Sequence, residues 1–403
     1  MGHTPWGALG IEEDHVPTIA AITHRRILNS HVAFTTEFAV TLDDGALGLG
    51  AAAEGETISI YEDRLSTDPA DVIDALRHDG LMDRPIGQED LDSYLAEKIG
   101  AFGRNTCFAL SLAFHNAVEL SPPVDRATRS DGPFAAPRLC CNILNGGRHA
   151  YTNPVLSDFP EYLLVSRSDD IEEVIGRHGV IQQAVKAALD HQAKVLVSGN
   201  PVSRFATADN RECIEFLLGI CDRLGFAHDF DLMVDASAGD LWNADGYRLS
   251  ITDDSLRSSE GFCDYWLDLL GQYALRFLED PFSEEDRASW LRLASAQQTC
   301  LLIGDNFYSS DAERIAQGAA NGWTHGVIVK PNQAGTLTAV RRSFVTAKEC
   351  GQIIIASHRS ISTESTLVAA LACRFGAEYI KVGPLITDYS SVMRVNEILR
   401  LTA

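Results

Sequence analysis

The sequence has far fewer basic than acidic residues, and it has no long apolar run. Lys and Arg number 33 against 56 Asp and Glu, which gives a formal net charge of −23. A nucleic-acid-binding surface needs basic patches, so this composition argues against a nucleic-acid partner. No apolar run approaches the roughly 18 residues of a membrane-spanning helix, so we expect no membrane partner.

The first residues and the cysteines also lack familiar patterns. The segment MGHTPWGALGIEEDH has neither a basic region nor an apolar region, so it does not predict a secretory signal. The nine cysteines lack the paired spacing of a metal site, and Cys140 and Cys141 are adjacent in an apparent strand. Buried, reduced thiols are the better interpretation, and they suggest a cytoplasmic protein.

What the sequence does contain is a repeated pattern between residues 230 and 383. Short apolar runs each end on a polar or charged residue, and after a longer first interval they recur about every 25 residues. The runs are FDLMVD, LRFLED, LLIGD, GVIVK, IIIASHRS and YIKVG. Such runs predict strands buried on both faces, and the interval fits one strand, one helix and two loops. The pattern predicts an α/β fold, a (β/α) barrel with its polar residues gathered at one end.

Three carboxylates and two lysines stand where these runs stop. They are Asp235, Glu279, Asp305, Lys330 and Lys381. Carboxylate oxygens suit a hard divalent cation such as Mg²⁺, and a lysine beside it can transfer a proton. The sequence therefore predicts a divalent-metal site next to proton-transfer groups.

We expect three regions along the chain: an extension over 1–18, an α+β domain over 19–137 and the barrel over 138–403. Within the α+β domain, a pair of β-rich runs is joined by Asp43-Asp44-Gly45, which predicts a hairpin, and helical segments follow. Residues 121–137 are rich in Pro, Asp and Gly and predict a connector. Two strands and two helices precede the barrel repeats, which departs from a simple eightfold βα order.

Six motifs together resemble those of the enolases, in the same order and at similar spacing. They are NGGRHA at 145, EDPF at 279, IGD at 303, VKPNQAG at 329, SHRS at 357 and IKVG at 380. The resemblance covers nearly the whole chain after Ile19. It implies a modified ββαα(βα)₆ TIM-type barrel with an N-terminal α+β lid domain, Mg²⁺ dependence, and a homodimer or larger homo-oligomer.

The resemblance also implies roles for single residues. Asp235, Glu279 and Asp305 match the magnesium ligands of the family. Lys330 matches the base that removes the proton next to the substrate carboxylate, and Lys381 matches the opposite lysine, which contacts the substrate. A lysine must be uncharged to act as such a base.

Further matches concern the acid side of the site and the phosphate. His149 matches the active-site histidine of the Asn-Gly-Gly loop. Glu161 matches an acidic residue if three residues are inserted after His149, and without that gap Asp158 takes the place. The phosphate-binding loop matches His358, Arg359 and Ser360.

Two segments depart from the family. Where enolases have Ser-Gly-Ala-Ser-Thr-Gly, this chain has Glu54-Gly-Glu-Thr-Ile-Ser, so a glutamate replaces the serine that closes over a second metal ion. Residues 199–206 contain no acid where enolases carry the glutamate that helps to expel the β-hydroxyl group, and they contain Arg204. We expect Glu54 to gate the ligand and Arg204 to bind a second anionic group.

Three functions fit these observations. The first is ordinary phosphopyruvate hydratase activity, against which the missing acid argues. The second is a diverged family enzyme that keeps enolate formation but changes the later step, acting on a small anionic phosphate or phosphonate carboxylate. The third is a catalytically inactive binding protein, which the retained carboxylates and lysines disfavour.

Overall fold

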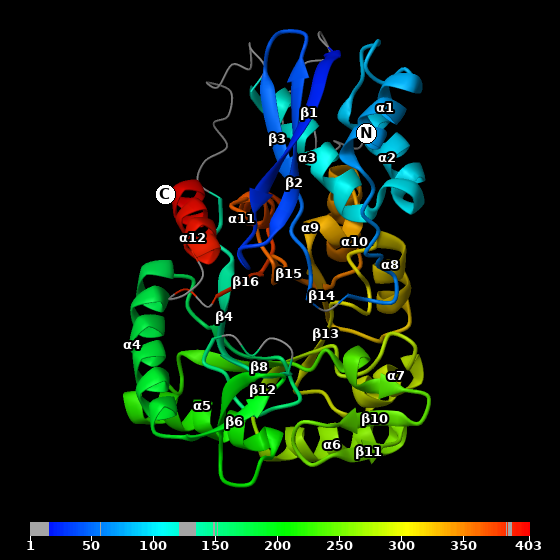
Figure 1. The fold of residues 1–403 in the computed structure, drawn as a ribbon. Coiled ribbons are helices and arrows are strands. Elements are labelled where there is room, and N and C mark those ends of the chain that lie inside the picture. The colour runs from blue at the N-terminus through cyan, green and yellow to red at the C-terminus, as the bar shows by residue number, and fades with distance from the viewer. Residues whose placement is uncertain are drawn as a thin grey trace.

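The computed structural model of the chain describes residues 16–56, 58–120, 134–147, 150, 152–383, 385 and 389–403. Figure 1 shows an N-terminal α+β domain, in blue and cyan, above a barrel that runs from green to red. The predicted α/β fold class with a TIM-type barrel is confirmed.

The N-terminal domain consists of an antiparallel sheet and three helices. The predicted Asp-Asp-Gly hairpin joins β2 to β3, with Gly45 at φ 87°. Gly48 and Gly50 of β3 let the sheet approach α3 closely, because a Cβ on either would lie 2.1 Å from a backbone oxygen of that helix. The elements, with sheet order β1-β2-β3, are β1 (Ile19–Leu28), β2 (Phe34–Leu42), β3 (Leu47–Ala51), α1 (Pro69–His78), α2 (Gln88–Phe102) and α3 (Arg104–Leu120).

Eight strands close the barrel in the order β12-β13-β14-β15-β16-β4-β5-β8. Seven of them run parallel, while β5 runs antiparallel to both of its neighbours, β4 and β8. The strands are β4 (Arg138–Asn145), β5 (Glu161–Ser166), β8 (Phe230–Asp235), β12 (Leu275–Glu279), β13 (Leu301–Gly304), β14 (Gly326–Val329), β15 (Ile353–Ala356) and β16 (Tyr379–Val382).

The helices that follow these strands give the ββαα(βα)₆ order implied by the resemblance, so that order is confirmed. Local signals set several of their ends: α5 begins with a capping box between Asp209 and Glu212 and ends at left-handed Gly225. The helices are α4 (Ile171–Asp190), α5 (Asn210–Leu224), α6 (Ser259–Gln272), α7 (Arg287–Ala296), α8 (Ala312–Ala320), α9 (Pro331–Ala334), α10 (Leu337–Glu349), α11 (Leu367–Phe375) and α12 (Tyr389–Thr402).

The barrel domain also contains several short elements that are not part of the barrel itself. The long first interval of the repeat holds η4 (Ala238–Leu241) and a small sheet of β9 (Trp242–Asn243), β10 (Gly246–Leu249) and β11 (Ser255–Arg257). A hairpin of β6 (Ala193–Val197) and β7 (Asn200–Arg204), which the sequence analysis did not predict, carries the segment that lacks the acid.

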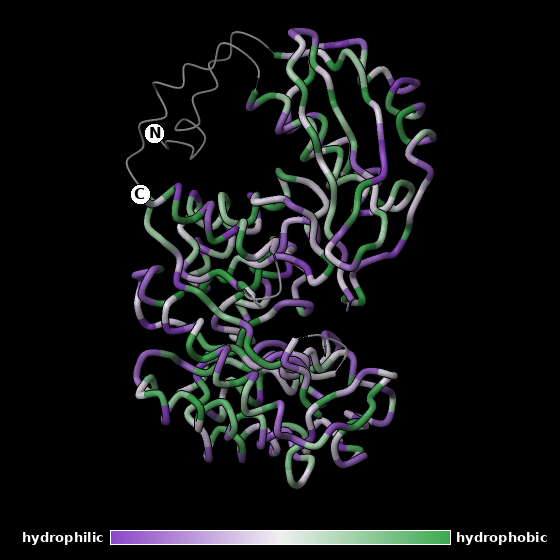
Figure 2. The backbone as a smooth tube through the Cα atoms, turned by 60° about the vertical axis from the view of Figure 1, so that its left-hand side comes forward, coloured by the Kyte–Doolittle hydropathy of each residue, from purple (hydrophilic) through white to green (hydrophobic). Residues whose placement is uncertain are grey.

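Side chains fill the interior of the barrel, so the site is confined to one end of it. The inner core comprises Cys140, Leu163, Val165, Met233, Phe277, Ile303, Ile328 and Ile355. Apolar and polar stretches alternate along the backbone in Figure 2. Within the described residues we find no helix whose length and apolar character would let it span a membrane.

Candidate active site

The barrel brings the predicted residues of seven strands to one end. In barrel order, β5, β8, β12 and β13 deliver carboxylates, while β14, β15 and β16 deliver Lys330, the His358–Ser360 loop and Lys381. Glu161 joins them because β5 is antiparallel, so its first residue lies level with the last residue of β8, Asp235. One pocket is lined by Glu161, Asp235, Asp305, Lys330, His358, Arg359, Ser360 and Lys381, with Glu279 buried next to it.

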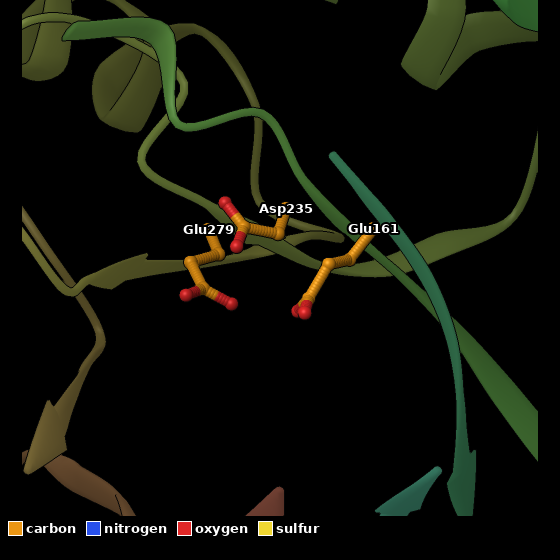
Figure 3. A group of neighbouring side chains, drawn as sticks. All are labelled: Glu161, Asp235 and Glu279. Atoms are coloured by element: carbon orange, nitrogen blue, oxygen red, sulfur yellow. The ribbon is translucent and has the colours of Figure 1, made fainter. Parts of the chain in front are cut away.

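Three of the carboxylates form a tight cluster around an ammonium group. One oxygen from each of Glu161, Asp235 and Glu279 lies within 4.8 Å of the others, and Figure 3 shows these side chains gathered together. Lys381 Nζ lies 2.7 Å from Glu161 Oε2, 2.7 Å from Glu279 Oε2 and 3.5 Å from Asp235 Oδ2. The centre of the cluster is therefore a place that favours a cation.

Burial and mutual repulsion perturb this cluster. Burial, reinforced by the charge of Asp235, raises the pKa of Glu279 well above its usual value, and burial likewise raises that of Asp235. Burial alone would lower the pKa of Lys381, but the charges of Glu161, Glu279 and Asp235 outweigh it and raise that pKa well above normal. Lys381 is therefore held in its charged form, and a divalent cation bound by the two carboxyl groups would favour their ionised forms.

The donor set fits Mg²⁺. Glu279 Oε1 and Asp305 Oδ1 are buried carboxylate oxygens without a hydrogen-bond partner in the described part of the chain. Such atoms are costly to bury unless something charged or polar satisfies them, and carboxylate oxygens are the ligands that Mg²⁺ prefers. Asp305 lies outside the tight cluster of three, but its charge contributes to the raised pKa of both Asp235 and Glu279.

Lys330 lies beside Asp305 in the same pocket. It caps the short helix α9, its backbone N–H donates to Ser310 Oγ, and its Nζ is in close contact with Asp305 Oδ2. Its side chain is 14% exposed, so the amine reaches the pocket. The pocket thus holds two lysines, one beside Asp305 and one within the carboxylate cluster.

The predicted phosphate-binding loop meets the N-terminal domain. Arg359 Nη1 lies 2.6 Å from Glu62 Oε2, and both side chains are about 95% buried, with 4% and 5% exposed. The other oxygen of Glu62 accepts hydrogen bonds from the Ser59 N–H and Gln333 Nε2. Sequence analysis missed Glu62, although it follows closely after the departing Glu54–Ser59 loop.

Removing Glu62 is expected to destabilise the fold strongly. Glu62→Ala takes the buried carboxylate partner from Arg359, which costs about 3–5 kcal/mol for a buried ion pair. Urea unfolding measures the loss. The control is Asp74→Ala, whose pairing with Arg77 at 2.6 Å is exposed and is worth at most about 1 kcal/mol. Equal losses in the two variants would show that Glu62 does not anchor Arg359.

The loop that departs from the family is fixed to the barrel at several points. Glu54 pairs through its backbone with Ile361, and the Glu56 N–H donates to Ser360 Oγ at 3.0 Å. Ser59 Oγ lies within hydrogen-bonding distance of Glu284 Oε1, at 2.9 Å, and of the Asn306 carbonyl oxygen, at 2.7 Å, and Gly55 lines the pocket. The N-terminal domain therefore covers the end of the barrel that holds the site.

The structure distinguishes the two alternatives for the acidic position. Glu161 lines the pocket and contacts Lys381, whereas the Asp158 carboxylate accepts hydrogen bonds from Asn210 Nδ2, the Ile251 N–H and the Thr252 hydroxyl. Asp158 therefore connects the segment before β5 to the turn between β10 and β11. This geometry favours the alignment with a gap after His149.

The remaining predicted site residues are His149, Glu54 and Arg204. His149 lies outside the described residues. Glu54 and Arg204 are exposed and do not line the pocket, so their roles remain predictions. In the acid-free segment, Val202 is buried and the Ser203 hydroxyl accepts a 2.6 Å hydrogen bond from Lys194.

Comparison with known protein families agrees with this architecture. The family model described as "Enolase, C-terminal TIM barrel domain" matches residues 134–403. The matched region contains all eight barrel strands and every pocket residue from Asn142 to Gly383.

Proposed function

We propose that this chain, which belongs to the enolase family, is a Mg²⁺-dependent enzyme that forms an enolate from a small phosphorylated carboxylate. The observation that carries the proposal is the placement of Lys330 and Lys381 in one pocket with Glu161, Asp235 and Asp305, beside buried Glu279. An inactive binding protein would have no need for this costly concentration of buried charge.

Each group in the pocket has a task in this chemistry. Lys330, in its neutral form, takes the proton from the carbon next to the substrate carboxylate, and the electron pair moves into that carboxylate. When bound by Asp235, Glu279 and a third carboxylate, Mg²⁺ supplies positive charge that offsets the resulting dianion. The protonated Lys381 adds a fixed positive charge close to the same region. Arg359 and Ser360 bind the phosphate or phosphonate group.

We further propose that the later step differs from simple dehydration. Residues 199–206 supply no acid, Val202 has no proton to give, and the Ser203 hydroxyl is engaged by Lys194. One family member that the chain resembles is carboxyphosphonoenolpyruvate synthase, of the route to phosphinothricin-type antibiotics. That enzyme attaches a phosphonoformate unit, supplied as its CMP ester, to a phosphoglycerate-derived skeleton.

Phosphopyruvate hydratase activity is the second candidate, and one observation favours it. Arg204, the cation expected to bind a second anionic substrate, does not line the pocket. In that case Glu161, which does line it, would act as the proton donor for the departing hydroxyl group.

We place the enzyme in the cytoplasm as a homodimer or larger homo-oligomer. The cysteines support the proposed location: all nine lie in the described ranges, they are free thiols, and eight of them are buried. The oligomeric state follows the resemblance to the family alone.

Phosphorus NMR of the products tests the proposed function. The protein is incubated with Mg²⁺ and 2-phosphoglycerate, with and without CMP-phosphonoformate. We expect dehydration of 2-phosphoglycerate alone to be at least about 10²-fold slower than in ordinary enolases, because a positioned acid contributes about 10²- to 10⁴-fold. Adding CMP-phosphonoformate should consume both compounds rapidly. Fast dehydration without it would establish the hydratase instead.

A further inference from the structure

Asn142 is a pocket residue to which neither the motifs nor the proposed chemistry gives a task. It lies on β4, paired with Leu163 of β5, and only 6% of its surface is exposed. Both residues line the pocket. Since β4 lies between β16 and β5 in the barrel, Asn142 stands where the lysine side of the ring meets its carboxylate side.

The hydrogen bonds of Asn142 fix the orientation of its amide. Its Nδ2 lies 3.0 Å from Glu161 Oε1, and Lys381 contacts the other oxygen of the same carboxylate. An ionised carboxylate only accepts hydrogen bonds, so the NH₂ group and not the carbonyl must face Glu161. The acceptor Oδ1 is thereby left for another partner.

This acceptor is buried, and no described residue donates to it. An unsatisfied buried acceptor costs about 1–3 kcal/mol, which a ligand with a suitable donor would recover. A hydroxyl group fits best, because it can donate to Oδ1 and still accept from an ammonium such as Lys381. A cationic donor would instead meet Lys381 as a like charge.

The backbone around Asn142 is held firmly. Gln182 Nε2 of α4 donates to the Asn142 carbonyl at 3.4 Å, and Asn153 Nδ2 donates to the next carbonyl, that of Ile143, at 2.8 Å. On the other side, Gly383, directly after β16, approaches the Asn142 backbone closely. A Cβ at Gly383 would lie 3.1 Å from the Asn142 nitrogen. The amide is thus fixed in position before a ligand arrives, as a specificity group requires.

We propose that Asn142 Oδ1 accepts a hydrogen bond from a substrate hydroxyl group, and that this contact selects a hydroxylated carboxylate over the corresponding deoxy compound. The proposal rests on the proposed function, because it assigns the hydroxyl end of the substrate to the wall formed by Asn142 and Glu161. The anionic end then lies toward Arg359 and Ser360.

Exchange of the α-proton in deuterated solvent, followed by proton NMR, tests this selection. The two probes are 2-phosphoglycerate and 2-phospholactate, which lacks only the hydroxyl group. We expect the wild type to prefer the hydroxylated probe by about 5- to 150-fold in kcat/KM for exchange, from the cost of an unpaired acceptor. In Asn142→Leu the preference should fall to about one, while exchange of 2-phospholactate persists and reports an intact pocket.

Two further variants separate recognition from general damage. Asn142→Asp keeps an acceptor oxygen and should keep the preference, although both probes should exchange more slowly because a second carboxylate then stands beside Glu161. Ser357→Ala removes a different pocket hydroxyl, which already donates to the His358 carbonyl, and should also keep it. If Asn142→Leu exchanges neither probe, Asn142→Ala is measured instead, and its preference for 2-phosphoglycerate over 2-phospholactate should likewise fall to about one. An unchanged preference in Asn142→Leu or Asn142→Ala, or no preference in the wild type, overturns the inference. Absence of all exchange in the wild type overturns the proposed function instead.

Discussion

Replacing Glu279 by glutamine is expected to lower turnover by at least about 10³-fold while the fold survives. The substitution keeps the volume of a side chain that is 0% exposed but removes the charge that would bind Mg²⁺. A bound metal stabilises the developing charge by several kcal/mol, and each 1.36 kcal/mol is tenfold in rate. Steady-state kinetics and calorimetric titration with Mg²⁺ should show the loss of rate and of binding together.

A matched variant and a chelator complete this experiment. Glu313→Gln, on the exposed face of α8, removes the same charge away from the pocket and should leave the rate unchanged. EDTA should reproduce the effect of Glu279→Gln on the wild type. Undiminished turnover in EDTA would contradict the metal dependence on which the proposed chemistry rests.

The same titration decides the third metal ligand. The resemblance implies Asp305, whereas the tight cluster contains Glu161 with Asp235 and Glu279. Weaker Mg²⁺ binding in Asp305→Asn than in Glu161→Gln would favour Asp305, because a direct ligand contributes more than a neighbouring carboxylate. Weaker Mg²⁺ binding in Glu161→Gln than in Asp305→Asn would instead favour Glu161 as the third ligand.

The barrel could be predicted from the sequence because each of its strands has a recognisable local pattern. Each barrel strand after residue 230 is a short, mostly buried apolar run, and its polar end marks the position of a site residue. Parallel strands place those ends together without any knowledge of side-chain contacts. This is why Asp235, Glu279, Asp305, Lys330 and Lys381 all lie at the same end of the barrel, as the pattern predicts.

Other features depend on contacts between distant segments, which the sequence pattern does not reveal. Glu62 and Arg359 are 297 residues apart, and nothing in either local motif indicates that they pair. The choice between Glu161 and Asp158 depends on the path of the segment before β5, where an insertion hides the alignment. In the sequence, Asn142 is one polar residue of a buried strand. Only its hydrogen bond to Glu161, which the structure reveals, distinguishes it from an amide with a purely structural role.

The β6–β7 hairpin was missed although a signal was present. Ser198-Gly199 forms a two-residue turn with both residues at positive φ, 50° and 85°, between paired Val197 and Asn200. That is the geometry of the tight hairpin turns which Gly-containing dipeptides favour.

Lys330→Ala is expected to abolish exchange of the substrate α-proton with deuterated solvent, a loss of at least about 10²- to 10⁴-fold. The amine lies in the pocket beside Asp305, and the proton it accepts must pass directly between it and the substrate carbon. Proton NMR of 2-phosphoglycerate in D₂O with Mg²⁺ measures the exchange separately from any later step. Lys348→Ala, at the exposed end of α10, is the matched control and should exchange normally.

A small primary amine added to Lys330→Ala distinguishes a base from a structural lysine. The Lys330 side chain is partly exposed, so the cavity left by its removal can admit an amine from solution. If the lysine acts as the base, the rescued rate should rise with the concentration of the neutral amine and therefore with pH. Loss of a structural contact with Asp305 gives no such dependence, because a dissolved amine does not restore a tethered ion pair. Unchanged exchange in Lys330→Ala would show that a residue other than Lys330 is the base.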